Sequence, residues 1–321
     1  MTAERTPRSN AHRAAVARRR RGALAVVALL CVFGVAAYLL RPSAGADRPP
    51  AQDPSLTMSA VDLAAKKAAA GAEEGAKAAQ AVEDRTWAIG QYAAQVPSTD
   101  GVNGGTSAGN LVALTFDDGP GRETWDVLAL LKRYKMHATF FVIGQNIADN
   151  PGAIEAAVRD GNVVGDHSMS HASLPSLDAA GLKREVVDTK ELIRQAAGIA
   201  PTLMRPPFGD FTGKTNQYVR GQGMLPVLWN VESNDWALHD PRTVADNVLS
   251  SPNLKAGAII LLHDGTSNRQ VTVNALPMIL DGLVQRGLRS VTVPELLRAG
   301  APSIARPGDY ALSEYATPAS G

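Results

Sequence analysis

From Leu111 onward, short apolar runs alternate with amphipathic stretches of helical length. The apolar runs are LVALTF, ATFFVIG, NVVG, TLMR, LPVLWNV, AIILLH and SVTV, and the helical stretches include 124–135, 151–160, 178–197, 241–250 and 272–286. Continuous apolar strands separated by helices are typical of a parallel sheet with helices packed on it. The pattern therefore predicts an α/β fold in which about seven parallel strands form a barrel.

A longer apolar segment lies near the start of the chain. Residues 23–40 are 18 positions without a charge, and seven Arg and no Lys precede them among the first 21 residues. A helix that spans a bilayer needs ~17–25 apolar residues, whereas the core of a signal peptide has ~7–15. We therefore predict a basic cytoplasmic segment over 1–22 and a transmembrane anchor or signal segment over 23–40, with the rest of the chain outside the cytoplasm. The sequence AGA at 44–46 keeps signal-peptide cleavage as an alternative.

Residues 41–110 separate this segment from the predicted barrel. Their part from 56 to 85 is rich in Ala with interspersed Lys and Glu, which favours helix but supplies few large side chains for a core. This composition predicts a helical stalk, with an interaction helix or a disordered segment as alternatives. The stretch 96–109 is rich in Gly, Ser and Thr and predicts a flexible linker. A folded domain is then expected over 111–300 and a flexible tail over 301–321.

Composition and charge exclude some classes of protein. The chain has 321 residues, 45% of them hydrophobic, which is enough for one large core. Its formal net charge of +1 argues against a general nucleic-acid-binding protein, so no nucleic-acid partner is expected. The only cysteine, Cys31, lies in the apolar segment, so no disulfide can form within one chain.

Polar side chains follow the apolar runs at the points where the predicted strands end. They are Asp117, Asp118, His167, Arg205, Glu232, Asp235, His263 and Asp264. In a β/α barrel, the active site forms at the carboxyl ends of the strands. Each motif also has a plain interpretation, because paired aspartates, for example, often cap a helix or stabilise a turn. Their occurrence together, each at a strand end, favours one shared site.

The HSMSH stretch places two imidazoles, His167 and His171, four residues apart. If this stretch is helical, both rings lie on one face and can bind one metal ion. Taken alone, the pair could equally be ordinary surface or core histidines.

Five motifs in this order, TFDDGP, HSMSH, RPPFG, ESNDW and LLHD, resemble those of carbohydrate esterase family 4, the polysaccharide deacetylases with a NodB homology domain. The resemblance covers about residues 110 to 300. It implies that the domain over 111–300 is catalytic and is a distorted (β/α) barrel, in agreement with the alternation of strands and helices. Members of the family remove acetyl groups from N-acetylated sugars of peptidoglycan, chitin or related polymers, and a few remove O-acetyl groups from xylan.

The resemblance implies a metal site and a general base beside it. Asp118, His167 and His171 are expected to hold a divalent metal ion. Zn is the first choice, and Co, Ni or Mn are alternatives that an Asp/His/His site accepts. Asp117 is expected to act as general base toward the attacking water. The two neighbouring carboxylates would then have different roles.

Two further ionisable pairs follow from the family motifs. Arg205 is expected to hold Asp117 ionised and correctly turned. His263 is expected to protonate the leaving nitrogen, with Asp235 paired to it so that its pKa stays high.

The resemblance also implies the walls of an acetyl pocket. The backbone N–H of Phe208 is expected to stabilise the oxyanion. Trp236 and Leu262 are expected to line the pocket, with ordinary core or rim packing as an equal alternative.

This chain departs from the family pattern at three positions. Phe208 stands where Tyr is usual, Glu232 where Asp is usual, and Asp166 where Asn is common. A contact made through the backbone should survive the first change. The other two changes place a longer and an additional carboxylate near the site.

These features favour a metal-dependent N-deacetylase that acts on a GlcNAc- or MurNAc-containing polymer, such as peptidoglycan or chitin, outside the membrane. Its partners would be that polysaccharide and, through the N-terminal segment, the membrane. An O-acetyl esterase acting on xylan or another acetylated glycan is one alternative, because the same groups serve amide and ester. A wall-binding pseudoenzyme is a second alternative, and it is disfavoured because base, ligands and acid are all present.

Overall fold

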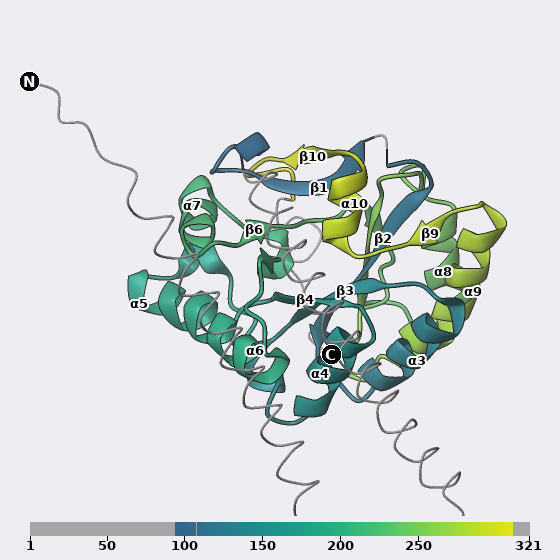
Figure 1. The fold of residues 1–321 in the computed structure, drawn as a ribbon, viewed down its shortest axis with the longest axis horizontal. Coiled ribbons are helices and arrows are strands. Elements are labelled where there is room, and N and C mark those ends of the chain that lie inside the picture. The colour runs from purple at the N-terminus through teal and green to yellow at the C-terminus, as the bar shows by residue number, and fades with distance from the viewer. Residues whose placement is uncertain (1–93, 107, 311–321) are drawn as a thin grey trace, which may run out of the picture. The chain divides into compact units, whose positions relative to one another are not determined.

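The computed structural model describes residues 94–106 and 108–310. Its strands are β1 (Gly101–Thr106), β2 (Leu111–Gly119), β3 (Ala138–Val142), β4 (Val163–Asp166), β5 (Leu203–Met204), β6 (Leu225–Pro226), β7 (Val231–Glu232), β8 (Ile259–His263), β9 (Arg289–Ser290) and β10 (Ala301–Ala305). Its α-helices are α3 (Thr124–Tyr134), α4 (Pro151–Arg159), α5 (Ala179–Leu182), α6 (Thr189–Ala197), α7 (Gly213–Gly221), α8 (Pro241–Leu249), α9 (Gln270–Gln285) and α10 (Val293–Ala299). Figure 1 shows these helices around a curled central sheet.

The central sheet runs in the order β6, β5, β4, β3, β2, β8 and β7, with β9 also paired to β2. All of its pairings are parallel. Parallel neighbours need a crossover connection, and helices supply most of these crossovers. β6 and β7, at the two ends of this order, do not pair among the described residues, so the sheet is a curled half-barrel. The predicted parallel α/β architecture is confirmed in this open form.

The run LPVLWNV, predicted as one strand, forms the two short strands β6 and β7. Between them, the carbonyl oxygens of Val227 and Leu228 accept hydrogen bonds from the buried side chain of Arg205, each at 3.1 Å. The N–H of Leu228 donates to the carbonyl oxygen of Val102 in β1 at 2.7 Å. Because these backbone groups bond outside the central sheet, the run cannot continue as one strand.

Side chains of the long strands alternate between two cores. Val112, Leu114 and Phe116 of β2 belong to the core between the sheet and the helices. Ala113 of the same strand belongs to the core inside the half-barrel. Because side chains on a strand alternate with a period of two, Asp117, near the end of β2, lies on the inner side. Burial on both faces explains why this strand is a continuous apolar run in the sequence.

Two helices, α7 and α10, lie outside the stretches that periodicity predicted. Thr212 precedes α7 and forms a reciprocal capping box with Thr215. Thr292 precedes α10 and does the same with Glu295. Thr is a favoured N-cap residue, and a Thr followed three residues later by Glu is the sequence pattern of a capping box. These signs could have identified both helices in the sequence.

The segment 178–197, predicted as one helix, consists of α5, a π-helical stretch over Lys183–Asp188, and α6. In the π-helical stretch, buried Glu185 accepts hydrogen bonds from the backbone N–H and the hydroxyl of Ser170, at 2.8 and 2.9 Å. π-turns inside helices occur frequently near functional sites. Here the carboxylate of Glu185 anchors the loop that carries the HSMSH motif.

A two-stranded antiparallel sheet joins the segments before and after the half-barrel. β1 pairs with β10 from Gly101 opposite Ala305 to Thr106 opposite Ala301. The prediction of a flexible linker over 96–109 is therefore wrong for the residues of β1. The prediction of a flexible tail is wrong for the residues of β10.

Glycine residues allow two backbone segments to approach each other closely at this sheet. A Cβ on Gly104 would lie 2.9 Å from the carbonyl oxygen of Gly257. Gly257 has a φ of +92°, and a Cβ there would lie 1.6 Å from the carbonyl oxygen of Gly105. The Gly-rich composition predicted a loop because glycine is common in loops, whereas here it lets two backbones touch.

No helix of the described residues is both long and apolar enough to cross a membrane. The basic segment predicted over 1–22, the membrane segment over 23–40 and the stalk over 56–85 lie outside the described residues, as does 311–321. The assignments made from the sequence for these segments stay predictions. The described structure covers the whole domain expected over 111–300 and extends beyond it on both sides.

Candidate active site

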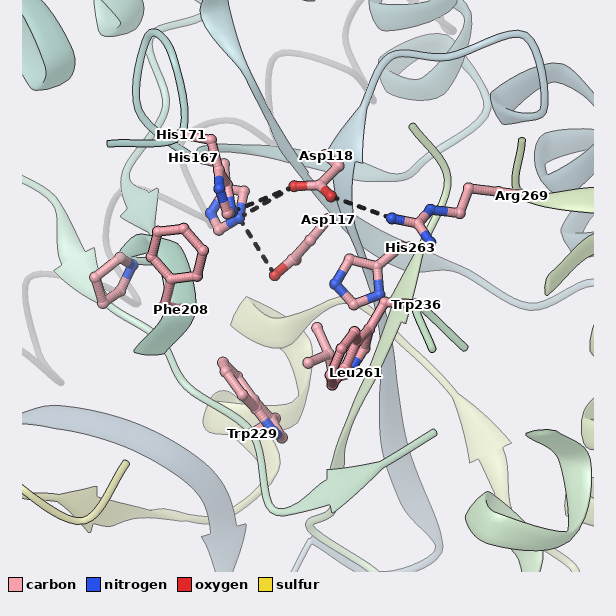
Figure 2. Close-up of a pocket in the computed structure, with 11 residues that line it drawn as sticks. Asp117, Asp118, His167, His171, Phe208, Trp229, Trp236, Leu261, His263 and Arg269 are labelled. Atoms are coloured by element: carbon pink, nitrogen blue, oxygen red, sulfur yellow. Dashed lines mark ion pairs between the residues drawn. The ribbon is translucent and has the colours of Figure 1, made fainter. Parts of the chain in front are cut away.

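A cavity of about 160 Å³ lies where the central strands end (Figure 2). It is lined by Asp117, Asp118, His167, His171, Pro206, Phe208, Trp229, Trp236, Leu261, His263 and Arg269. Parallel strands end on the same edge of a sheet, so residues far apart in the sequence meet there. Most of the site residues predicted from the sequence line this cavity. The exceptions are Arg205, Asp235 and Leu262.

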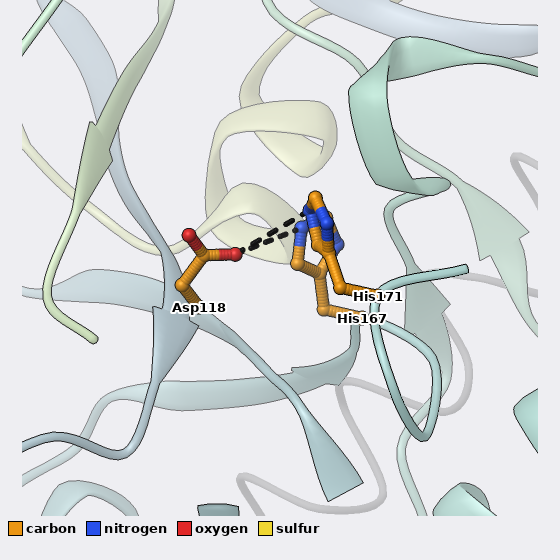
Figure 3. Close-up of side chains that lie close together, drawn as sticks. All are labelled: Asp118, His167 and His171. Atoms are coloured by element: carbon orange, nitrogen blue, oxygen red, sulfur yellow. Dashed lines mark ion pairs between the residues drawn. The ribbon is translucent and has the colours of Figure 1, made fainter. Parts of the chain in front are cut away.

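Three of the lining residues form a cluster that can hold a metal ion, namely Asp118, His167 and His171 (Figure 3). One ligand atom from each residue lies within 4.8 Å of the other two. The Oδ1 atom of Asp118 is 3.6 Å from Nε2 of His167 and 3.5 Å from Nε2 of His171. These separations exceed hydrogen-bond lengths, and Oδ1 is buried without a hydrogen-bond partner among the described residues. A divalent ion would satisfy all three atoms.

The HSMSH stretch brings its histidines together without forming a helix. His167 directly follows β4, and residues 167–171 contain no helical turn. Ser168 and His171 have φ values of 66° and 61°, in the left-handed region, so the chain folds back sharply. The stretch is therefore not helical, and a tight loop, rather than a shared helical face, brings the two imidazoles together.

Both imidazoles have lowered pKa values, and their neutral forms can act as metal ligands. Nδ1 of His167 donates to the carbonyl oxygen of Arg205 at 2.8 Å, which leaves Nε2 with its lone pair. Burial, and then the neighbouring His171, lowers the pKa of His167 to about 3. Burial also lowers the pKa of His171. One carboxylate and two neutral imidazoles fit a divalent transition metal.

The two aspartates reach the same cavity although they are adjacent on a strand. On a regular strand, neighbouring side chains point to opposite faces. The register between β2 and β3 shifts between Asp117 and Gly119, and Asp118 has a φ of 70°. A local bulge of this kind re-aims one side chain. The pairing of carboxylates thus depends on a backbone irregularity at the strand end.

A buried arginine holds Asp117. Nη1 of Arg205 donates to Oδ1 of Asp117 and to the hydroxyl of Thr115, each at 2.8 Å. The guanidinium carbon lies 4.3 Å from the ring centroid of Phe141. Burial raises the pKa of Asp117, and the positive charge of Arg205 offsets only part of that rise. The expected pairing is present, and the net shift makes Asp117 a stronger base than an exposed aspartate.

A second pair joins His263 and Asp235. Nδ1 of His263 lies 2.7 Å from Oδ1 of Asp235. Oδ2 of Asp235 accepts from the backbone N–H of His263 at 2.8 Å and from the hydroxyl of Thr272 at 2.6 Å. Burial acts to lower the pKa of His263, but the charge and hydrogen bond of Asp235 outweigh burial and raise it to about 9. Burial acts to raise the pKa of Asp235, and His263 reverses this, so the net shift is downward.

Aromatic residues form part of the cavity wall. Phe208 has a φ of 61°, and its ring packs edge-on against the His171 ring with centroids 4.4 Å apart. Trp236 lines the cavity with 39% of its surface exposed. The ring of Phe208 therefore packs against a predicted metal ligand.

Leu262 does not line the cavity, and the prediction that it does is wrong. It belongs to the core between the sheet and the helices, and Leu261 lines the cavity instead. Leu261 shares the inner face of β8 with His263, two residues later, because side chains alternate along a strand. This alternation could have identified the correct leucine in the sequence.

The other two departures from the family pattern lie outside the lining of the cavity. Glu232 accepts a hydrogen bond from the indole N–H of Trp229 at 2.6 Å, so it orients a tryptophan of the cavity wall. Asp166 is fully buried and accepts from the N–H of Ser168 at 2.7 Å. Burial raises the pKa of Asp166 well above its usual value. Burial thus disfavours the additional negative charge expected there.

Left-handed backbone is concentrated in the loops of this site. Among the described residues other than glycine, positive φ occurs at Asp118, Lys135, Ser168, His171, Phe208, Asn234 and Thr266. All of these except Lys135, the C-cap of α3, belong to segments that carry residues of the site. Such a conformation costs about 1–3 kcal/mol per residue and persists where the surrounding structure enforces it. Its clustering supports a functional site independently of side-chain chemistry.

Two lining residues could not be identified from local signals. Arg269 follows the LLHD motif by five residues in a polar loop, outside every motif. Its Nη2 atom lies 3.6 Å from Oδ2 of Asp118. Trp229 lies within the apolar run LPVLWNV, and no feature of that run marks it as a cavity residue.

Known proteins resemble this chain over the half-barrel. The sequence model of the polysaccharide deacetylase family matches residues 104–227. A peptidoglycan-N-acetylglucosamine deacetylase of Bacillus cereus is 37% identical over 191 residues, which cover 59% of this chain and 88% of the relative. The peptidoglycan-N-acetylmuramic acid deacetylase PdaC of Bacillus subtilis is 36% identical over 188 residues, which cover 58% of this chain and 38% of the relative.

A solved structure has the same fold. The crystal structure of the Bc1960 peptidoglycan N-acetylglucosamine deacetylase, in complex with an N-hydroxybenzamide compound, matches with a TM-score of 0.58 and 32% identity. The match covers 60% of this chain and 91% of that structure. Sequence relatives, a solved structure and the motifs gathered in one cavity agree, and this chain therefore belongs to the polysaccharide deacetylase family, carbohydrate esterase family 4, with a NodB homology domain.

Proposed function

We propose that this protein removes acetyl groups from N-acetylated sugars of peptidoglycan by hydrolysis. The observation that carries the proposal is the convergence, at one cavity, of a three-residue ligand cluster, a carboxylate held by a buried arginine, and a histidine whose charged form a carboxylate stabilises. Hydrolysis of an acetamide needs a base, a stabilised oxyanion and an acid for the leaving amine. The relatives named above act on N-acetylglucosamine or N-acetylmuramic acid of peptidoglycan, which supports this substrate class.

Asp118, His167 and His171 would hold a divalent cation, with Zn as the first choice and Co, Ni or Mn as alternatives. The unpartnered oxygen of Asp118 and the lowered pKa values of both histidines support this assignment. When bound, a divalent cation supplies Lewis-acid chemistry that polarises the acetyl oxygen and makes a water molecule more acidic.

Asp117 accepts the proton of the attacking water. Its Oδ1 atom accepts a hydrogen bond from Arg205. Its Oδ2 atom lies 3.7 Å from Nε2 of His167 and therefore faces the ligand cluster. As the water oxygen bonds to the acetyl carbon, one water proton moves to Oδ2. Arg205 orients the carboxylate, and burial strengthens it as a base.

His263 donates a proton to the sugar nitrogen as the C–N bond breaks. Asp235 occupies its Nδ1 side, so Nε2–H is the remaining donor of the protonated ring. A pKa of about 9 keeps that ring protonated at neutral pH. The proton gained by Asp117 and the proton lost by His263 balance, so the products are acetic acid and the free amine, and the acid then ionises to acetate at neutral pH.

The backbone N–H of Phe208 stabilises the negative charge that develops on the acetyl oxygen. Support comes from the left-handed φ of Phe208 and from its ring, which packs against His171 and so ties this turn to the ligand cluster. Trp236 and Leu261 close the acetyl pocket from other sides.

The alternatives differ in polymer or in chemistry. An O-acetyl esterase would use the same base and acid, so only the substrate distinguishes it, and the named relatives favour the N-acetyl group. A wall-binding pseudoenzyme has no need of the hydrogen bonds by which Arg205 and Asp235 hold reactive groups in place.

We also propose that the catalytic domain works outside the cytoplasmic membrane. The 18-residue apolar segment over 23–40, with its Arg-rich flank, supports an anchor or a signal segment. The chain between this segment and the half-barrel would let the domain reach the polymer of the cell wall.

The experiment that tests the function is acetate release by the purified protein. Peptidoglycan, chitooligosaccharides and acetylxylan are compared, each after removal of metal by a chelator and after addition of Zn, Co, Ni or Mn. We expect release from peptidoglycan that stops with the chelator and returns with metal. Release from acetylxylan alone would establish the esterase instead. A folded, metal-loaded protein that releases no acetate from any polymer would contradict the enzymatic function.

A further inference from the structure

Arg269 makes a contact that the proposed mechanism does not use. Its Nη2 atom lies 3.6 Å from Oδ2 of Asp118, and its Nε donates to the carbonyl oxygen of Gly265 at 3.1 Å. The residue is only 8% exposed and lines the cavity. Figure 2 shows it on the side of Asp118 opposite the two histidines. The two oxygens of Asp118 therefore face different partners.

The loop that carries Arg269 is pressed against the backbone of Asp118. A Cβ on Gly265 would lie 2.1 Å from the carbonyl oxygen of Asp118. The hydroxyl of Thr266, which has a φ of 68°, donates to the same oxygen at 3.4 Å. Arg269 ends this loop as the residue before α9. Backbone contacts thus fix the position from which the guanidinium reaches Asp118.

The carboxylate of Asp118 needs a partner on that side. Its Oδ1 atom has no hydrogen-bond partner among the described residues, so Oδ1 cannot hold the side chain in one orientation. A second carboxylate, Asp117, precedes it in the same cavity and repels it. Arginine carries a charged, planar group of fixed geometry, which suits the restraint of one carboxylate oxygen.

We propose that Arg269 is a positioning residue for Asp118: it restrains Oδ2 and so keeps Oδ1 directed at His167 and His171. The inference rests on the proposed function, because it takes Asp118 as a metal ligand. Arg269 acts through that ligand and not on the substrate. Removal of a group that orients a metal ligand typically weakens metal binding by about 10–100-fold.

The test is the Zn(II) affinity of the full-length protein, measured by competition with a chromogenic chelator. Arg269→Gln should weaken the Kd by about 10–100-fold. Arg269→Lys should weaken it less, because a positive charge remains near Asp118. The matched control is Arg286→Gln, because Arg286 also donates to backbone carbonyls, those of Gly282 and Leu249, at the other end of α9. The control should bind Zn(II) as the unsubstituted protein does.

The outcomes separate positioning from a purely structural role. If Arg269→Gln binds Zn(II) within about threefold of the unsubstituted protein, well below the expected effect, the inference is overturned. Lower thermal stability with unchanged Zn(II) affinity would also overturn it, since Arg269 would then only hold the loop. If Arg269→Gln does not fold, Arg269→Met, which also removes the charge but keeps a long side chain, is judged by the same affinity criterion. An unsubstituted protein that binds no Zn(II) would remove the proposed metal site as well, which is a different result from a failure of Arg269 alone.

Discussion

Asp117 and Asp118 are neighbours in the chain, but their surroundings differ. Oδ1 of Asp117 accepts a hydrogen bond from Arg205, whereas Oδ1 of Asp118 faces two imidazole nitrogens. The left-handed backbone at Asp118 brings both carboxylates into one cavity. One strand end therefore supplies a candidate base and a candidate ligand.

The two aspartates should respond differently to the same substitution. Asp118→Asn removes an anionic ligand, so metal content and acetate release should fall together. Asp117→Asn leaves the ligand cluster intact, so metal should stay bound while the rate falls by roughly 10²–10⁴-fold. Metal content by mass spectrometry, compared with acetate release, tests both. If Asp117→Asn loses metal as readily, Asp117 is a ligand, and near-normal activity in both variants would contradict the mechanism.

The pairing of His263 with Asp235 predicts an alkaline limit of activity. The pKa of His263 is raised from 6.5 to about 9, so the acid is protonated below this range and is lost as the pH rises through about 9. The same pair stabilises the folded state below a pH of about 6.5, and that contribution disappears as the pH rises through about 9. In Asp235→Asn, burial dominates, so the alkaline limb of kcat/KM should move to lower pH.

Profiles of kcat/KM against pH, recorded with saturating metal, measure this shift. Thr272→Val is the control, because it removes one hydrogen bond to Asp235 but keeps the charge beside His263. Its limb should move much less. An alkaline limb that stays in place in Asp235→Asn would assign the limit to a group other than His263.

At the scale of elements, the half-barrel relies on segments outside the alternating pattern. Val102 of β1 and Ala305 of β10 belong to the core inside the half-barrel. Tyr310, after β10, donates its hydroxyl to the carbonyl oxygen of Trp229, and the two rings pack with centroids 5.1 Å apart. Because Trp229 lines the cavity, these flanking segments support a wall of the site.

Gly257→Ala should destabilise the fold much more than Gly287→Ala. Both glycines have positive φ, 92° and 68°, and so share a backbone cost of about 1–2 kcal/mol. Only at Gly257 would the new Cβ meet backbone, 1.6 Å from the carbonyl oxygen of Gly105 in β1, while nothing lies within 4 Å at Gly287. Urea unfolding should show an additional loss of ~2 kcal/mol or more at Gly257. Equal losses would mean that the contact with β1 contributes little.

At the scale of the whole molecule, the expected arrangement is an external catalytic domain attached through residues 23–40. The full-length protein should sediment with membranes. Protease added from the outer side should cut it, because an Arg-rich flank tends to remain on the cytoplasmic side and leaves the rest of the chain outside. A chain without residues 1–46 should not sediment with membranes. A mature chain that begins at Asp47 in the culture fluid would show that the segment is a cleaved signal.

The parallel α/β architecture and the set of motifs at the strand ends could be predicted from the amino-acid sequence. Both depend on local patterns: the central strands are apolar on both faces, the covering helices are amphipathic, and the chain returns each motif to the same edge of the sheet. Alternation along β8 and the capping residues at Thr212 and Thr292 were also available locally.

The interactions among these groups depend on the folded chain and could not be predicted from local patterns. Burial and Arg205 together set the net pKa shift of Asp117. The loop after β8 brings Arg269 to Asp118. The pairing of β1 with β10 orders segments that were assigned to a linker and a tail on the basis of composition. These features depend on burial and on contacts between residues far apart in the chain. The composition of a segment and the spacing of its residues do not contain that information, because the same glycines or the same arginine can lie in a solvated loop or against a buried backbone.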